Sequence, residues 1–583
     1  MIYFEKLGLM QLLALWVSRK HVYYGSNSIA MRLFERLGIE VNAKLLSFGD
    51  VQTAPNIRRN AYQAAELQIG KLSGKQWAAE LSRVLGIDFG LIFRKFIFDE
   101  LYAKYEFIEL AMRHALESGS PDGIICLDRR WSEPYQERLT AVMAVRYFAK
   151  LDHFYCLSVL LLPIYLRYFW QKNRTDEDLH FEGQIVCQVD SDKLHEMFSR
   201  IFQAYPKKSF VIEKRYAAGF GESRLKEAGI KVLGLTPACY RFLSRTAYRY
   251  ALLCFKYFGD ISIYGSRLFQ VFHYLIVGRV EAVAGSGNLF FAYEHSVIFK
   301  AVRNEFLRAE GSRSIFVPMN AHATPRYYHS EIFVNYDVIC SAGRHTDDLY
   351  RERRSVTSIF LPTGTYDSHR GTLDVQGMAA RIARLMSFKG DSLAITILSP
   401  GICGPTYSHE IRLMKLAREL ASLPGVKVFI RLKPVPPAPE YADFYEKQTF
   451  GYPSILLTFS EFELVDFLEV TDLFVTSISN SGCDLALRGA QIMFIDYLRD
   501  PDMFLYWSIV KEAVFAEEES MDAILDWIRD DSGYRQRFAE TMVRLSDYLG
   551  YRFPDFESYN SNLLTRLRSE FQGHPALAKT AGT

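Results

Sequence analysis

Short apolar runs alternate with amphipathic segments through the C-terminal half of the chain. The apolar runs, each of which predicts a buried parallel strand, are LAITILSP, VKVFIRLKP, SILLTF, DLFVTS and QIMFIDY. Between them lie segments with helical periodicity, namely SHEIRLMKLARELASL, EFELVDFLEV and GCDLALRG. This alternation predicts a doubly wound, Rossmann-like domain.

A second series of strand candidates lies in the N-terminal half. Its members are QIVCQVD, SFVIEK, IKVLGL, NLFFAYEH, SIFVPMN, FVNYDVICSAG and SIFLPTG. Nearer the N-terminus, His21 to Phe48 reads as strand, helix and strand, and GIICLD reads as another strand. The stretches Pro55–Leu116 and Pro134–Asn173 are predicted to be mostly helical.

The predicted fold class is therefore α/β, with two Rossmann-like domains facing each other across a cleft and helical insertions in the N-terminal half. We expect an N-terminal acceptor-side domain at 1–370, a linker at 371–390 and a C-terminal donor domain at 391–583. A chain of 583 residues is longer than one hydrophobic core normally supports, which agrees with two domains.

Charge and cysteine content narrow the class of partner. Lys and Arg number 69 against 67 Asp and Glu, so no global field recruits nucleic acid or an anionic membrane. The eight cysteines form no CxxC pair, and we expect reduced thiols. The first twenty residues make a poor signal peptide, because Glu5 comes early and no small-residue cleavage pattern follows. We therefore expect a cytoplasmic protein, with peripheral contact at the inner membrane as an open alternative.

The most membrane-like stretch is FYCLSVLLLPIYLRYFW, from Phe154 to Trp170. Pro163 and Arg167 interrupt it, and it is shorter than the roughly 20 apolar residues that span a bilayer. We expect a buried core helix here; the alternative is a helix that lies in the membrane interface.

Three loops that follow C-terminal strands could bind a nucleotide, because ligands of open parallel sheets bind beyond the carboxyl ends of the strands. Glycines and small hydroxyl side chains at a helix N-terminus can approach a phosphate, and cations can neutralise it. The candidate donor-binding residues are Gly401, Gly404, Thr406, Arg431, Lys433, Ser479, Asn480, Ser481, Gly482 and Asp484. For the loop with Gly401, Gly404 and Thr406, the alternative is a tight turn. For Arg431 and Lys433 it is a solvated basic strand end. For the loop from Ser479 to Asp484 it is an N-cap turn without ligand.

Titratable residues follow successive strands of the N-terminal half. Glu294 and His295 come after NLFFAY, and His322 ends the next predicted strand. A carboxylate or imidazole at such a position can take a proton from an acceptor hydroxyl, so these three are the candidate catalytic residues. Each histidine alone could equally be a surface or capping residue.

The motifs RLKP, SISNSGCDLALRGA with IMFIDY, and FVNYDVICSAGRHTDDLYRER with SIFLPTGTYD resemble one family. The family is the bacterial surface-polysaccharide glycosyltransferases of the GT-B type, including capsule or lipopolysaccharide Kdo- and sialyltransferase-like enzymes and the related glycerophosphotransferases. The resemblance covers roughly Asn288 to Asp496. One departure is the absence of the family's His beside the proline, since Lys433 precedes Pro434 here and Val435 follows it.

The resemblance implies transfer of a sugar from a nucleotide-sugar to a surface polysaccharide or a lipid-linked glycan. No DxD motif follows a strand, so we expect a metal-independent enzyme with no cofactor beyond its donor substrate. Two alternatives remain open. One is a nucleotide-sugar 2-epimerase, and the other is a noncatalytic glycan- or nucleotide-binding scaffold of a polysaccharide assembly complex.

Overall fold

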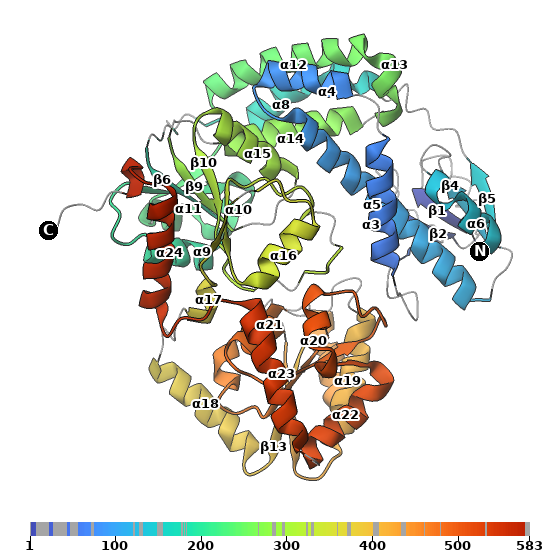
Figure 1. The fold of residues 1–583 in the computed structure, drawn as a ribbon, viewed down its shortest axis with the longest axis vertical. Helices are drawn as coiled ribbons and strands as arrows, with labels where there is room; N and C mark the ends of the chain where they lie inside the picture. The colour runs from blue at the N-terminus through green and yellow to red at the C-terminus, as the bar shows by residue number, and fades with distance from the viewer. Residues whose placement is uncertain are drawn as a thin grey trace.

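Three parallel β-sheets organise the computed structural model of the protein (Figure 1). The structure describes residues 2–6, 22–26, 43–46, 56–71, 75–119, 123–127, 132–147, 156–175, 179, 181, 183–265, 267–282, 287–293, 298–321, 324–327, 331–357, 359–369, 375–399, 407–432, 439–459, 461–477, 480–530 and 533–577. Helices pack on and between the sheets, which confirms the α/β class.

The C-terminal sheet has six strands in the order β15-β14-β13-β16-β17-β18. They are β13 (Leu393–Leu398), β14 (Val426–Arg431), β15 (Ile455–Thr458), β16 (Leu473–Thr476), β17 (Ile492–Asp496) and β18 (Val514–Ala516). Counted along the chain this is the order 3-2-1-4-5-6 of a Rossmann fold. All five predicted strands are present. The helix predicted over EFELVDFLEV is reduced to the 3-10 turn η8 (Leu464–Phe467).

The second sheet has seven strands in the order β12-β11-β10-β9-β6-β7-β8. They are β6 (Ile185–Val189), β7 (Lys208–Glu213), β8 (Ile230–Leu233), β9 (Leu289–Ala292), β10 (Arg313–Phe316), β11 (Val338–Ser341) and β12 (Ile359–Pro362). Each corresponds to a predicted strand. Counted from β6 the strands again follow the Rossmann order, with a seventh strand added beyond the sixth.

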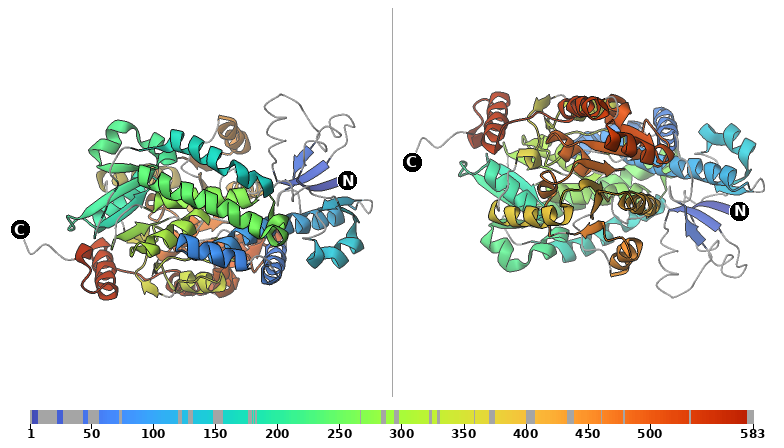
Figure 2. Two further views of the ribbon diagram at one scale, coloured as in Figure 1. Left: turned by 90° about the horizontal axis from the view of Figure 1, so that it is seen from above. Right: turned by 90° about the horizontal axis from the view of Figure 1, so that it is seen from below.

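A third sheet near the N-terminus has five strands, in the order β3-β2-β1-β4-β5. They are β1 (Ile2–Lys6), β2 (Val22–Ser26), β3 (Ala43–Leu45), β4 (Ile124–Leu127) and β5 (Ala144–Tyr147). Figure 2 shows this sheet to one side of the other two. Counted along the chain its strands have the order 3-2-1-4-5, which also occurs in the two larger sheets. Its strands β2, β3 and β4 were predicted from the sequence, whereas β1 and β5 were not.

The prediction of one long helical stretch over Pro134–Asn173 is wrong. This stretch holds α6 (Gln136–Val142), β5, the 3-10 helix η4 (Cys156–Leu161) and α8 (Leu162–Asn173). The edge strand β5 is mostly exposed, so its residues carry no apolar signal that could separate a strand from a helix.

A layer of helices covers the seven-stranded sheet on the side away from the six-stranded domain (Figure 1). Its members are α4 (Lys75–Leu85), α8, α12 (Pro237–Lys256), α13 (Phe258–Ile261) and α14 (Arg267–Glu281). The helices α3 (Ile57–Gly70) and α5 (Phe89–Glu117) pack on each other and lie between this layer and the five-stranded sheet. The rings of Trp77 in α4, Phe93 in α5 and Tyr250 in α12 pack against one another in the core between these helices.

The expectation that Phe154–Trp170 forms a buried core helix is wrong. Of the residues of α8 only Leu162 and Leu166 are buried, and Pro163 stands in its first turn, where a missing N–H costs nothing. Ile164 is 69% exposed. The stretch has more apolar side chains than the helix has inward-facing positions.

Two helices near the predicted domain limits pack on opposite domains. The helix α18 (Val375–Lys389) packs on the six-stranded domain, where Leu385 is buried and Arg381 Nε donates to Asp466 Oδ2 at 2.6 Å. The last long helix, α24 (Phe556–Glu570), instead buries Tyr559 and Leu563 in the core of the seven-stranded domain. The limits 371–390 and 391–583 stay predictions, and the chain crosses between the two domains a second time before α24.

The two larger sheets face each other with their carboxyl ends. The backbone N–H of Ala321, after β10, donates to Asp484 Oδ1 at 3.2 Å, and Arg488 Nη2 donates to the Asp367 carbonyl at 2.5 Å. The first bond joins the loop after β10 to α21 (Asn480–Leu487), and the second joins the short helix α17 (Tyr366–His369) to the residue that follows α21. The prediction of two facing Rossmann-like domains is confirmed.

Candidate functional site

Polar side chains from both domains gather where the two sheets face each other. We call this group the interdomain cluster; its members are Asp190, Lys193, Tyr293, Asn320, Asp367 and Asp484. Five of them follow a strand, namely β6, β9, β10, β12 and β16 in that order. Lys193 is in the first turn of α9 (Asp192–Ile201), directly after β6. The polarity of parallel strands therefore brings together residues that are far apart in sequence.

Asp484 is the member contributed by the six-stranded domain. Its side chain is buried near the middle of α21 and accepts a hydrogen bond from the Ala321 backbone. Burial, and then the nearby carboxylate of Asp367, raise the pKa of Asp484 to about 8, against the smaller opposing effect of that hydrogen bond. The carboxyl group can thus gain or lose a proton near neutral pH.

Asp367, from the seven-stranded domain, is the carboxylate that faces Asp484. Its Oδ2 accepts from Lys193 Nζ at 2.6 Å, and its backbone N–H donates to the Met319 carbonyl at 2.7 Å. Its Oδ1 is buried and has no hydrogen-bond partner among the described residues. Since a buried carboxylate oxygen without a partner is costly, this atom is placed to accept a hydrogen bond from a ligand.

Tyr293 contributes a donor to the same cluster. Its hydroxyl donates to Asn320 Oδ1 at 2.9 Å. Burial, followed by the carboxylates of Asp367, Asp484 and Asp190, raises the pKa of Tyr293 far above its ordinary value. The phenol therefore stays protonated. The cluster holds three carboxyl groups, and two cations lie beside them, namely Lys193 and Arg488, which both lower the pKa of Asp484.

The predicted donor-binding residues are only partly covered by the structure. Gly401, Gly404, Thr406, Lys433 and Ser479 lie outside the described residues, and Asn480 is described only as the first residue of α21. Their roles stay predictions.

Arg431 is the described cation of this group. It is the last residue of β14, and its Nε is buried with no hydrogen-bond partner in the described part of the chain. Burial lowers the pKa of Arg431, and the neighbouring carboxylate of Asp466 opposes that effect. A buried guanidinium at a strand's carboxyl end can bind an anion.

The loop between β16 and α21 also has features of a binding loop. The Oγ of Ser477 is buried and has no partner among the residues described. A Cβ on Gly482 would lie 3.2 Å from Thr476 Cγ2 and 3.4 Å from Phe494 Cε1, so a larger residue there would have to displace Thr476 by a few tenths of an ångström. Ser481, beside it, is half-buried.

Glu294, His295 and His322, the predicted catalytic residues, lie outside the described residues. Their chain neighbours Tyr293 and Ala321 are a member of the interdomain cluster and a donor to it. The three roles therefore stay predictions.

His345, which also follows a strand, lies at the domain interface. Its ring centroid is 5.5 Å from those of Tyr506 and Tyr548, both contributed by the C-terminal part of the chain. This buried packing makes it a residue that joins the two domains.

The sequence reasoning missed Asp190, Lys193, Tyr293, Asn320 and Asp367. Each comes within a few residues of a strand's carboxyl end, so a signal was present. Asp367 was overlooked because TGTYD reads as the start of a polar linker.

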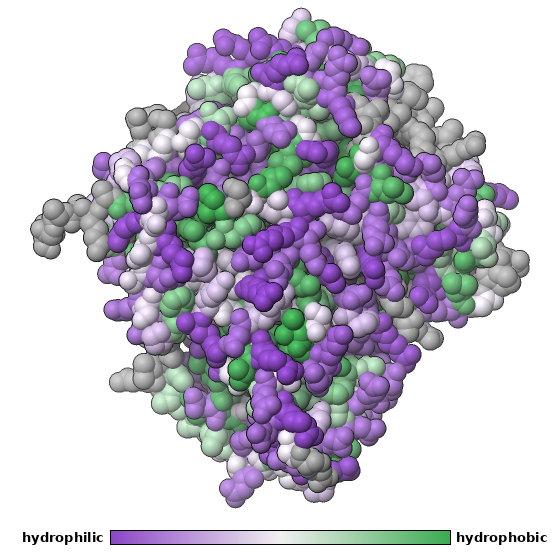
Figure 3. Space-filling model, in the orientation of Figure 1, coloured by the Kyte–Doolittle hydropathy of each residue, from purple (hydrophilic) through white to green (hydrophobic). Residues whose placement is uncertain are grey.

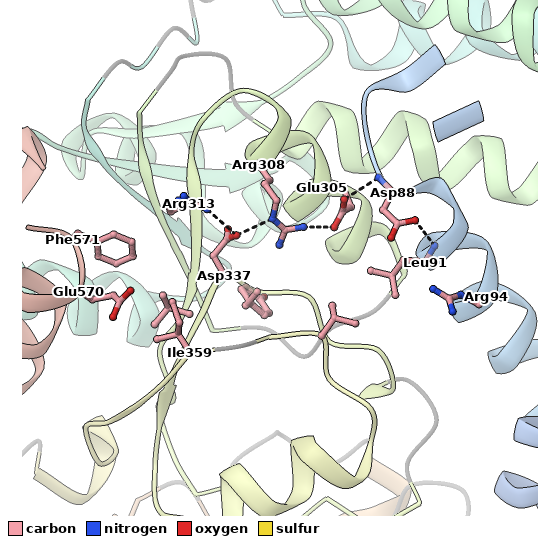
Figure 4. Close-up of a pocket in the computed structure, with 13 residues that line it drawn as sticks. Asp88, Leu91, Arg94, Glu305, Arg308, Arg313, Asp337, Ile359, Glu570 and Phe571 are labelled. Carbon is pink, nitrogen blue, oxygen red and sulfur yellow. Dashed lines mark hydrogen bonds and ion pairs between the residues drawn. The ribbon is translucent and has the colours of Figure 1, made fainter. Parts of the chain in front are cut away.

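A separate cavity of about 470 Å³ lies at the opposite, amino edge of the seven-stranded sheet (Figure 4). Four of its charged side chains, Arg308, Arg313, Glu305 and Asp337, pair with one another. Arg308 Nε donates to Asp337 Oδ1 at 2.9 Å, Arg308 Nη1 donates to Glu305 Oε1 at 2.5 Å, and Arg313 lies 3.6 Å from Asp337. This network of paired side chains connects α5, α15 (Ile298–Ala309) and the sheet. Because its charges compensate one another, we assign it a structural role and not a catalytic one.

No group of three or more His, Cys, Asp or Glu side chains among the described residues is arranged to hold a metal ion. Within the same residues, no helix is both long and apolar enough to cross a membrane.

Comparison with known proteins identifies no family for the chain. No family model matches the chain, and no curated protein matches it. Among solved structures it is similar to MnaA of S. aureus in complex with UDP, with 10% identity and a TM-score of 0.43 over 69% of this chain and 99% of that one. It is similar to the wall teichoic acid polymerase TagF, with 10% identity and a TM-score of 0.40 over 73% and 100%.

A third similar structure is HepE of Anabaena in complex with UDP-glucose. The identity is 9% and the TM-score 0.39, over 66% of this chain and 99% of that one. At these values the likeness supports no inference about residues or activity. The assignment of two facing Rossmann-like domains rests on strand order and on the contacts between the carboxyl ends of the sheets.

Proposed function

We propose that the protein is a glycosyltransferase that moves a sugar from a nucleotide-sugar to a hydroxyl of a surface polysaccharide or a lipid-linked glycan. The observation that carries this proposal is the Asp367–Asp484 carboxyl pair. Its two members come from opposite domains, and the carboxyl ends of both sheets converge on it. Transfer needs the donor and the acceptor to meet between two binding surfaces, and the pair lies at that meeting point.

The six-stranded domain would bind the donor. Arg431 and the buried Oγ of Ser477 supply a cation and a hydroxyl after β14 and β16. The N-terminus of α21, with Asn480, Ser481 and Gly482, adds backbone N–H groups and the positive end of a helix dipole. The predicted residues Gly401, Gly404, Thr406, Lys433 and Ser479 would complete this phosphate-binding surface.

The carboxyl pair would remove the acceptor's proton. As the acceptor oxygen bonds to the anomeric carbon, the bond from that carbon to the donor phosphate breaks, and Asp367 Oδ1 or Asp484 accepts the hydroxyl proton. A carboxyl group whose pKa lies near the working pH is suited to this step. Arg431 would stabilise the charge that develops on the leaving phosphate. Glu294, His295 and His322 are the other candidates for the base.

The proposal includes no metal or cofactor beyond the donor substrate, and it includes a cytoplasmic location and a role in capsule or lipopolysaccharide biosynthesis in a bacterium. Peripheral contact with the inner membrane is part of the same proposal. A nucleic-acid partner is not part of the proposal.

A thermal-shift screen against CMP, CDP, UDP, GDP and ADP tests the donor site, because a ligand that binds the native state raises its melting temperature. We expect a shift with one nucleotide that is lost in Arg431→Ala and Ser477→Ala. The matched control is Arg529→Ala, at the exposed end of α22 (Glu517–Arg529), which should keep the shift. If none of the five nucleotides shifts the protein, the donor site is rejected and the scaffold alternative becomes the better account.

A nucleotide-sugar 2-epimerase is the second candidate. The presence of three carboxyl groups, Asp190, Asp367 and Asp484, in one cluster favours it, because epimerisation needs several acid–base groups around one sugar ring. Incubation of the stabilising nucleotide-sugar without acceptor separates the two activities. Interconversion of the free nucleotide-sugar would show an epimerase, whereas turnover that requires an added glycan would show a transferase.

A further inference from the structure

Two segments of the outer helical layer contain no acidic residue. They are 156–174, which includes η4 and α8, and 237–256, which is α12. Together they carry seven basic residues, namely Arg167, Lys172, Arg174, Arg241, Arg245, Arg249 and Lys256. In a chain whose total charge is nearly balanced, this is a strong local excess of positive charge.

The same segments expose an unusual number of large apolar side chains. Nine of the nineteen exposed large hydrophobic residues in the described part of the chain lie on them or on the adjoining α13: Leu157, Leu160, Leu161, Ile164, Tyr168, Tyr248, Leu252, Phe255 and Phe258. On the face seen in Figure 3, hydrophobic side chains form several groups that hydrophilic side chains separate. Scattered exposed apolar residues need no explanation, but a concentration of them indicates a binding surface.

The two segments form one surface, which we call the α8–α12 face. At one end the rings of Trp170 and Tyr240 lie 4.9 Å apart, and at the other end Leu157, Phe255 and Phe258 line the same narrow groove. The segments therefore run antiparallel beside each other, in the layer farthest from the six-stranded domain (Figure 1).

Along α12 the exposed residues Arg241, Arg245, Tyr248, Leu252 and Phe255 follow one another at spacings of four and three, so they share one side of the helix. The stripe is basic at its start and apolar at its end. On α8, Lys172 Nζ lies 4.6 Å from the centre of the Tyr168 ring, which again places a cation beside an exposed apolar group. Among these cations Lys256 is paired, with Glu80 at 2.7 Å.

We propose that the α8–α12 face docks on an anionic lipid surface. Lipid headgroups complement the arginines and lysines, while the leucine, isoleucine and phenylalanine side chains enter the boundary between headgroups and acyl chains. Tyrosine is favoured at that boundary because it is apolar at one end and polar at the other. The docking lies in the plane of the membrane, since α8 has only 12 residues.

A second copy of the chain fits this surface less well. Two α8–α12 faces pressed together would oppose cations to cations with no carboxylate from either segment to compensate. An anionic lipid surface satisfies both the charge and the apolar side chains. The inference extends the membrane contact of the proposed function, but it does not depend on the transferase chemistry, because the face lies across the seven-stranded domain from the interdomain cluster.

Co-sedimentation of the full-length protein with vesicles tests the proposal. One set contains phosphatidylcholine alone and the other contains phosphatidylcholine with phosphatidylglycerol. We expect binding to the second set, weakened by added salt. The double variants Ile164→Ser/Leu252→Ser and Arg241→Glu/Arg245→Glu should each bind about tenfold less tightly or worse.

Matched changes elsewhere serve as controls. Phe450→Ser removes a side chain that is 87% exposed on the six-stranded domain, and Arg529→Glu reverses an exposed charge there. Both should bind vesicles like the wild type. Asp484→Asn should also bind normally, so a failure of the transferase proposal is separable from a failure of this one.

Two results would overturn the proposal. In the first, both double variants keep wild-type binding to the anionic vesicles. In the second, the wild type ignores vesicles but forms a dimer, detected by light scattering, that the same variants disrupt. That result would assign the face to a contact between copies of the chain.

Discussion

The two edges of the seven-stranded sheet both carry clustered charges, but the charges are balanced differently. At the amino edge, Arg308 and Arg313 are matched by Glu305 and Asp337, and they surround a cavity of about 470 Å³ (Figure 4). At the carboxyl edge, three carboxyl groups face two cations, Lys193 and Arg488, and Asp367 Oδ1 has no hydrogen-bond partner among the described residues.

Under the proposed function the chemistry lies at the carboxyl edge and not at this cavity, so the presence of a cavity alone does not locate the chemistry of a parallel sheet. A charge-balanced network has no group left to bind or to titrate, so it acts as a structural joint. An unbalanced cluster at the carboxyl ends holds perturbed groups in the place where the fold binds ligands.

The largest expected effect is on turnover. Asp484→Asn removes a titrating carboxyl group from the interdomain cluster but keeps an oxygen for the Ala321 N–H. With the nucleotide-sugar identified by the thermal-shift screen, we expect kcat to fall by about a hundredfold or more while the nucleotide-induced shift stays.

The matched variant at the amino edge is Asp337→Asn, which should leave kcat within about twofold of the wild type. If Asp337→Asn lowers kcat as much as Asp484→Asn does, the contrast between the two edges fails.

The second effect concerns stability against pH. The folded pKa of Asp484 is raised from 3.8 to about 8, so as pH rises the unfolded chain loses this proton first and folding stability falls between those values. At about 1.4 kcal/mol per unit, the total is on the order of a few kcal/mol. Asp484→Asn abolishes the titration, so its stability relative to the wild type should rise with pH in that range.

Urea midpoints measured for both proteins from about pH 5 to about pH 9 test this statement. A constant difference between the two proteins at every pH would contradict it.

The third effect is a loss of stability at the amino edge. Asp337 accepts from Arg308, from the Ser314 backbone and from the Ser314 hydroxyl. Asp337→Ala leaves these donors without their acceptor, which should cost about 2 kcal/mol of unfolding free energy. Chemical denaturation measures it, and Asp526→Ala, on the exposed side of α22, is the control that should be nearly neutral. A neutral Asp337→Ala would mean that the network is not a structural joint.

The sequence predicted all strands of the two larger sheets except the short edge strand β18 (Val514–Ala516). The strand β17 is buried at every position and contains the continuous apolar run IMFI. The partly buried edge strands β12 and β15 were also predicted, because each still contains a short apolar run. The edge strand β5 is mostly exposed and was read as helix. Burial therefore leaves a pattern in the sequence, whereas a mostly exposed strand leaves none that separates it from a helix.

The candidate site was predictable only in part, for a related reason. Asp484 stood out because it follows a strand and lies in a loop rich in small residues, but its partner Asp367 is 117 positions earlier. Nothing in the residues near Asp367 indicates that it faces the other domain. That contact depends on how two sheets are placed in space, which local patterns do not encode.

The smallest effect tests how tightly the carboxyl edge is joined to the C-terminal part of the chain. A Cβ on Gly343, after β11, would lie 2.4 Å from the Leu549 backbone, and the Tyr551 N–H donates to the neighbouring Ala342 carbonyl at 2.8 Å. Gly343→Ala must therefore push the two segments apart, and we expect a loss of about 1 kcal/mol or more. Gly219→Ala, in α10 (Lys214–Phe220), is the matched control, because its Cβ would meet nothing within 4 Å. That change should be neutral or slightly stabilising. Equal melting temperatures for the two variants would show that the carboxyl edge tolerates movement there, and the fixed approach of Asp367 to Asp484 would then lose one of its supports.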